Sequence, residues 1–144
     1  MNSRLQDRIV LLTEVYKHRW DENLLRLPAT DILIGRLIDF ANADVPSDYL
    51  CFLQISNGIL DLDDVNTVIA SSKVWREHWP GCLILGSDGG EGHYLMDLLF
   101  DGRSSDDAPV LYFENEGLDL SNDTREWESF TQFFLDTFTQ ETLY

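Results

Sequence analysis

Long apolar runs are missing from this sequence of 144 residues, and so is an apolar leader. No stretch approaches the roughly 18 consecutive apolar residues that a membrane-spanning helix needs. The N-terminal residues Met1–Arg8 are polar and charged, and the apolar core of a signal peptide does not follow them. The sequence therefore predicts a cytoplasmic protein that does not bind a membrane.

Cysteine is scarce as well. Cys51 and Cys82, the only two cysteines, lie among apolar residues, which is typical of reduced core thiols in the cytoplasm. At this point the sequence leaves it open whether these two cysteines form a disulfide. Neither a Cys-x-x-Cys nor a His-x-x-x-His spacing occurs, and His18, His78 and His93 are far apart, so no transition-metal site is predicted.

Basic residues are few. Ten Lys and Arg stand against 26 Asp and Glu, which gives a formal net charge of -16. The excess is concentrated after residue 87, where fourteen acidic residues accompany only Arg103 and Arg125. Such a charge repels the phosphates of nucleic acids and of anionic lipids, and it attracts basic proteins. Charge alone leaves two interpretations open: a surface that keeps the protein soluble, or a surface that binds a basic protein.

Motifs for catalysis and for small ligands are also absent. The glycine-rich loop Gly86–Gly92 contains no lysine, and Asp88 and Glu91 would repel a phosphate. We interpret it as a hairpin loop that can also act as an acidic contact loop. Residues 61–66 lack the glycine and the closing glutamate of a calcium loop, and no Gly-x-Ser-x-Gly motif occurs. We therefore expect no catalytic residues, no metal site and no cofactor.

The first part of the chain carries helical patterns. Ser3 can cap a first helix, and Thr30 or Asp31 can cap a second. Pro46 opens a third helix, which ends at Asn57-Gly58 because these residues tolerate left-handed geometry. Apolar residues share one helix face in each case. They are Ile34, Leu37, Ile38 and Ala41 in the second helix, and Tyr49, Phe52 and Leu53 in the third.

The middle of the chain changes to short extended patterns. We expect extended segments over residues 59–62 and 67–69, with a turn at 63–66 between them. Ser71 or Ser72 is expected to cap a helix that Pro80-Gly81 ends.

Strands dominate the pattern after residue 81. We expect them over 82–85, 93–98 and 109–113, and the first two should pair antiparallel across the glycine-rich loop. A final helix capped by Asp123 or Thr124 follows, with aromatic residues at helical spacing. These residues are Trp127, Phe130, Phe134 and Phe138. The order of elements predicts an α+β fold, mainly an antiparallel sheet packed by helices.

Four of these segments, in this order, resemble the SUKH superfamily of small SMI1/KNR4-like domains. They are the helix pair 32–58 that ends in Asn57-Gly58, the hairpin 83–98 with its acidic loop, the strand 109–113, and the Ser-Phe helix 128–134. The resemblance is strongest over residues 30–138, while the first helix and the acidic insert 101–107 are its least typical parts. It implies a single SUKH-like domain that spans residues 1–144.

Many bacterial members of this superfamily resemble immunity proteins that neutralise toxins. The resemblance therefore implies a non-catalytic acidic protein that binds a cognate toxin stoichiometrically, and a basic nuclease-type toxin would suit the charge. An intracellular regulatory or scaffold protein of the same fold is the alternative. From charge and turn position we expect Asp88, Glu91, Glu114, Glu116 and Asp119 to contact the partner.

Overall fold

The computed structural model describes residue 7 and residues 27–59, 61–87, 92–99, 108–114 and 125–139. The helices are α2 (Asp31–Ala41), α3 (Ser47–Ile55), α4 (Val65–Trp75) and α5 (Phe130–Thr139). The strands are β1 (Cys82–Ser87), β2 (Gly92–Asp97), β3 (Val110–Glu114) and β4 (Arg125–Trp127). The helix expected after Ser3 lies outside the described residues apart from Asp7, which is helical.

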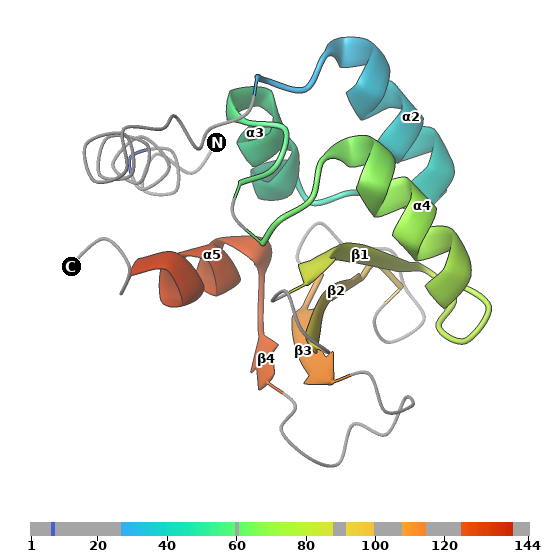
Figure 1. The fold of residues 1–144 in the computed structure, drawn as a ribbon, viewed down its shortest axis with the longest axis vertical. Helices are drawn as coiled ribbons and strands as arrows, with labels where there is room; N and C mark the ends of the chain where they lie inside the picture. The colour runs from blue at the N-terminus through green and yellow to red at the C-terminus, as the bar shows by residue number, and fades with distance from the viewer. Residues whose placement is uncertain are drawn as a thin grey trace.

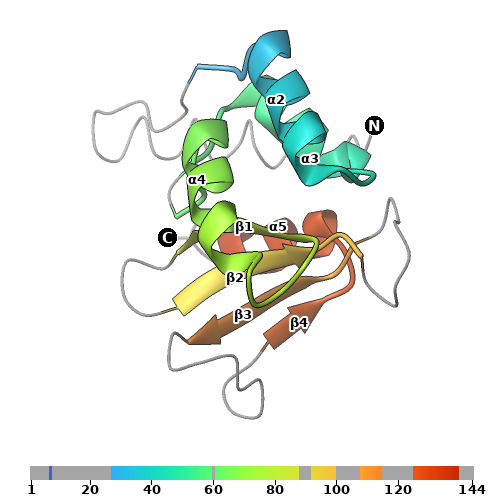
Figure 2. The same cartoon turned by 90° about the vertical axis from the view of Figure 1, so that its right-hand side faces the viewer.

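The four strands form one antiparallel sheet in the order β1-β2-β3-β4. Figure 1 and Figure 2 show α2, α3 and α4 above this sheet, while α5 lies to the left of the sheet in Figure 1 and behind it in Figure 2. The expected α+β fold with an antiparallel sheet is therefore confirmed, and so is the hairpin between β1 and β2. Because α3 also contacts α5, the helices enclose the core between them and one face of the sheet.

The main core is aromatic where α3 meets α5. Tyr49 and Phe52 are buried on α3, as expected, and their rings lie against Phe130 and Phe134 of α5. The Tyr49 and Phe130 ring centroids are 5.0 Å apart, and those of Phe52 and Phe134 are 5.6 Å apart, which is the usual range for packed aromatic pairs. The spacing that suggested a core face is thus confirmed for Tyr49 and Phe52 on α3 and for Phe130 and Phe134 on α5.

The opposite face of the sheet carries a second, smaller apolar cluster. Strand residues alternate between the two faces, so the residues between those of the main core point to this side. They are Cys82, Ile84, Leu95, Leu111 and Phe113. Trp75 and Trp79, at and after the end of α4, pack against them, which makes both tryptophans packing residues here.

The outer edge of β1 is closed by the segment that follows α3. The expected extended segment over 59–62, a short strand or a strand-like crossing, forms isolated bridges, one of which joins Leu62 to Gly86. The Asp63 N–H donates to the Leu85 carbonyl at 2.9 Å, and the Ser87 N–H donates to the Asp61 carbonyl at 3.2 Å. A Cβ at Gly86 would lie 1.9 Å from the Asp61 carbonyl oxygen, so glycine is required for this close approach.

Helix α4 begins earlier than the sequence suggested. The expected turn at 63–66 and extended segment at 67–69 were wrong, because Asp64 caps a helix that already starts at Val65. The Asp64 side chain accepts from the Thr67 N–H at 2.8 Å. Ser72 is not a cap but a buried residue inside the helix: its hydroxyl donates to the Val68 carbonyl and accepts from the Ile84 N–H of β1.

The end of α4 is joined to α2 and β1 by one side chain. Nε of Arg76 donates to the Cys82 carbonyl at 3.1 Å, while its two terminal nitrogens donate to the carbonyls of Phe40 and Ala41 at 2.9 and 2.8 Å. The guanidinium also lies 4.4 Å from the centroid of the Phe40 ring. Arg76 thus donates to carbonyls at the C-terminus of α2. The last carbonyls of a helix have no N–H partner within the helix itself.

The final helix also starts elsewhere than expected. Residues 125–127 form β4 rather than the first turn of a helix, and Trp127 therefore lies on a strand, paired with Val110. Helix α5 begins at Phe130. The expected caps, Asp123 and Thr124, lie outside the described residues.

Candidate protein-binding surface

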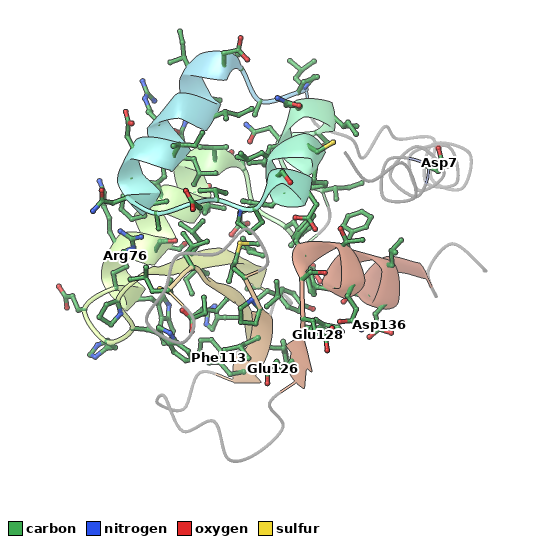
Figure 3. All side chains as sticks on the ribbon, turned by 180° about the vertical axis from the view of Figure 1, so that it is seen from behind. Asp7, Arg76, Phe113, Glu126, Glu128 and Asp136 are labelled. Atoms are coloured by element: carbon green, nitrogen blue, oxygen red, sulfur yellow. The ribbon has the colours of Figure 1, made fainter. Side chains whose placement is uncertain are left out.

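An acidic corner, defined by Glu126, Glu128 and Asp136, lies where β4 runs into α5. All three side chains are exposed, and Figure 3 shows them gathered at this junction. Residues 126–137, whose side chains are all described, include no basic group. The corner therefore presents negative charge that no neighbouring base in this segment offsets.

Local hydrogen bonds set the geometry of this corner. The Ser129 hydroxyl accepts from the Gln132 N–H at 3.2 Å, and Gln132 Oε1 accepts from the Glu128 N–H at 3.0 Å. This reciprocal pattern is close to a capping box, which fixes where α5 begins. The Ser-x-x-Gln spacing was visible in the sequence, and it could have located the helix start that we placed at Asp123 or Thr124.

One carboxylate of the corner is held by a tryptophan. Nε1 of the buried Trp127 donates to Oδ2 of Asp136 at 2.9 Å, so a strand residue orients a helix residue. This hydrogen bond holds the exposed Asp136 carboxylate in one orientation at the surface.

Helix α5 is tied in turn to α3 by Asp48. Its Oδ2 accepts from both the N–H and the hydroxyl of Thr131, and its Oδ1 accepts from the N–H of Tyr49. A carboxylate near the N-terminus of a helix is stabilising because it pairs with orphan N–H groups and with the positive end of the helix dipole. The acidic corner is thus anchored to the core through α3.

Acidic side chains are not confined to this corner. Among the described residues, exposed carboxylates also occur on α2, in the segment before α3, in the segment that closes β1 and just after α4. They belong to Asp31, Asp39, Asp44, Asp61 and Glu77. The corner differs in that its three acids lie together in a segment whose described side chains include no base.

The contact residues that the sequence suggested lie mostly outside the described residues. This applies to Asp88, Glu91, Glu116 and Asp119. Glu114 is the last residue of β3, and it pairs with Gly92, where the chain re-enters the sheet after the hairpin loop. The backbone register therefore places Glu114 at the same end of the sheet as that loop.

Two titratable groups lie side by side where β1 starts and β2 ends. Cys82 pairs with Asp97 across β1 and β2. Burial raises the pKa of the Cys82 thiol to about 11, although the charge of Arg76 opposes the effect. Burial also raises the pKa of the Asp97 carboxyl, against hydrogen bonds from the Leu99 N–H and the Trp79 side chain. A thiol that stays protonated at neutral pH is a poor nucleophile.

Both cysteines are free, which resolves the question of a disulfide. Burial is also the main cause that raises the pKa of the Cys51 thiol. In the part of the chain that the structure describes, no three His, Cys, Asp or Glu side chains are grouped to hold a metal ion. None of the helices within the described ranges has the length and apolar character needed to cross a membrane.

Comparison with known proteins identifies the family. The model of the SMI1 / KNR4 family (SUKH-1) matches residues 28–136, a range that contains all the helices and strands from α2 through most of α5. Comparison with curated proteins gives no significant match. The expected resemblance is therefore confirmed over most of the chain, and the protein belongs to the SMI1 / KNR4 family (SUKH-1).

Proposed function

We propose that this protein is an immunity-type binding protein that neutralises a basic, nuclease-type toxin by stoichiometric binding in the cytoplasm, without catalysis. The acidic corner of Glu126, Glu128 and Asp136 is the observation that carries the proposal. Membership of the SUKH-1 family and the formal net charge of -16 support it.

The physical mechanism is electrostatic. A nuclease holds its substrate in a basic groove that binds phosphates. Carboxylates fixed at one place on an inhibitor imitate that charge, and they steer the two proteins together before they dock. The Trp127–Asp136 hydrogen bond holds one of these carboxylates in place, so little of its side-chain freedom is lost on binding.

A second group of acids remains predicted from the sequence. Asp88, Glu91, Glu114, Glu116 and Asp119 are expected to extend the contact. The pairing of Glu114 with Gly92 supports this, because it brings the end of β3 beside the end of the hairpin loop. The corner and this group would then contact different parts of the same basic partner.

The test uses the toxin domain encoded beside the gene for this chain. We expect a 1:1 complex by calorimetry, and loss of toxin activity in proportion to added protein. The association rate should fall steeply with ionic strength, because charge steering is screened within about 10 Å at 0.1 M salt.

Two double variants that remove the same amount of charge distinguish the effect of the acidic corner from the effect of the net charge. Glu126→Gln with Glu128→Gln should lower the association rate at low salt about three- to tenfold and flatten its salt dependence. Asp61→Asn with Glu77→Gln removes the same charge elsewhere and should have a smaller effect. Equal effects would refute the role of the corner. A basic partner without toxicity would instead assign the protein a regulatory role.

A further inference from the structure

A surface pocket lies between the end of α2 and the start of α3. It has a volume of about 330 Å³ and is lined by Ile38, Ala43, Asp44, Val45 and Leu50. Four of these residues are apolar, and Asp44 is the only charged one among the described residues of the lining. Among its described lining residues, the pocket therefore combines four apolar side chains with one carboxylate.

The α2 wall of the pocket is held in place by backbone hydrogen bonds. Asn42 takes a left-handed conformation with φ 51°, and its N–H donates to the Ile38 carbonyl at 3.2 Å. Arg76 holds the next carbonyls, those of Phe40 and Ala41. The last turn of α2, which carries Ile38, is thus fixed before any partner binds.

The α3 wall is held as firmly. Leu50 lies in the first turns of α3, two residues after Asp48, whose carboxylate is bonded to Thr131 of α5. Pro46 restricts the backbone just before the helix, since its ring fixes φ. A pocket with both walls preorganised loses little conformational entropy when it is filled.

The size and chemistry of the pocket select its occupant. Small-molecule sites usually have volumes of about 300–1,000 Å³, so this pocket is at the lower limit and suits a single large side chain. Ile38 is 42% exposed, so apolar surface is available for burial. Lysine and arginine bury an aliphatic stem along apolar surface while the charged group stays in water, and the lining of this pocket includes the exposed Asp44.

We propose that this pocket receives one lysine or arginine side chain of a protein partner. The stem packs between Ile38 and Leu50, and the charged group pairs with Asp44. The inference rests on the proposed function only in taking the partner to be a basic protein. It assigns that partner a further contact, on the α2–α3 side of the molecule.

Blocked tripeptides test the pocket without the partner. The probes are Ac-Gly-Arg-Gly-NH₂, its citrulline analogue, which has the same shape without the charge, and Ac-Gly-Glu-Gly-NH₂. With the isotopically labelled full chain, the arginine probe should shift the amide signals of the lining residues in a saturable manner. Citrulline should bind about two- to fivefold more weakly, as expected for loss of an exposed ion pair, and glutamate should cause no saturable shift.

Variants of the chain test whether the saturable shifts arise from binding in this pocket. Ile38→Gln should remove the saturable shifts, and Asp44→Asn should make arginine and citrulline equivalent. The controls are Ile32→Gln, a 73% exposed residue of the same helix outside the pocket lining, and Glu126→Gln at the acidic corner. Thermal unfolding of each variant shows that it remains folded.

Several outcomes would overturn the inference. They are shifts centred elsewhere, equal affinity for arginine and glutamate, or shifts that survive Ile38→Gln. A dimer in sedimentation that Ile38→Gln dissociates would also refute it, because a second copy of the chain would then fill the pocket. Failure of the toxin domain to bind the wild-type protein refutes the proposed function alone, whereas failure of the arginine probe refutes the pocket alone.

Discussion

At the scale of single residues, Asp97 is a carboxyl whose charge opposes folding. Burial is the main cause that raises its pKa, and the hydrogen bonds from Leu99 and Trp79 offset this only in part. The folded state therefore binds the proton more tightly than the unfolded state does. The stability linked to this proton is complete below the unfolded pKa and is lost as the pH rises through the folded pKa.

Asp97→Asn should accordingly stabilise the protein at pH 7. Asparagine keeps the oxygen that accepts from Leu99 and has no charge to desolvate. The gain should stay below about 1 kcal/mol because the carboxyl is partly exposed, and it should disappear near pH 3, where the aspartate is protonated in both states. Urea unfolding at the two pH values measures it. The exposed Asp39→Asn is the control, and a loss of stability at pH 7 in Asp97→Asn would contradict the prediction.

At the scale of secondary-structure elements, Arg76 connects α4 with α2 and β1. Arg76→Lys should destabilise the protein by about 2–3 kcal/mol, because an ammonium cannot reproduce the planar fork that reaches three carbonyls. Denaturant unfolding gives this value, and hydrogen exchange should show the end of α2 opening first. The exposed Arg36→Lys on α2 should change stability by less than about 0.5 kcal/mol. Equal stability of the two variants would refute the bridging role of Arg76.

The two glycines at positions 35 and 86 offer an opposed pair of substitutions. Gly35→Ala in α2 adds a methyl group that would meet nothing within 4 Å, so it should stabilise the helix by about 1 kcal/mol. Gly86→Ala should cost about 2 kcal/mol or more, because its methyl group would overlap the Asp61 carbonyl. Thermal unfolding compares them. A Gly86→Ala variant as stable as the wild type would contradict this prediction. It would show that the backbone of residues 61–62 can move away from β1 to make room for the methyl group.

Sequence patterns located most elements, but they assigned residues 67–69 to an extended segment instead of α4 and did not predict strand β4. Thr67-Val68-Ile69 is β-branched and favours a strand, yet the Asp64 cap and the burial of Val65 and Val68 against the core favour a helix. Strand β4 has only three residues, and Trp127 stands at helical spacing from Phe130. Local spacing could not reveal it, since pairing with β3 decides its conformation.

The surface features were harder to predict than the fold. The acidic corner depends on Trp127 orienting Asp136 and on the turn between β4 and α5, which the sequence pattern assigned to a helix. The pocket joins Ile38 and Leu50 across two helices, and their approach depends on Asn42 and Arg76. Such features arise from contacts between residues far apart in the chain, which spacing within one element does not encode.

At the scale of the whole molecule, the formal net charge of -16 must oppose compaction. Raising NaCl from about 20 mM to about 300 mM shortens the screening length and should raise the Tm by about 4 °C, the shift that roughly 1 kcal/mol gives in a domain of this size. Calorimetric scans measure this. Choline chloride should act equally if screening is the cause, and the variant that combines Glu126→Lys with Glu128→Lys should respond less. A Tm that does not change with the salt concentration would contradict the prediction. It would show that repulsion between the acidic side chains does not lower the stability of the folded state.

The contact between position 86 and residue 61 has a consequence for how this protein can diversify. This contact joins two main chains, so it excludes a side chain at position 86. It involves no atom of the side chain at position 61, which is exposed. A substitution at 61 that keeps the path of the main chain therefore leaves this closure of the β1 edge intact. A relative that binds another partner could therefore differ at this exposed position and keep the same core.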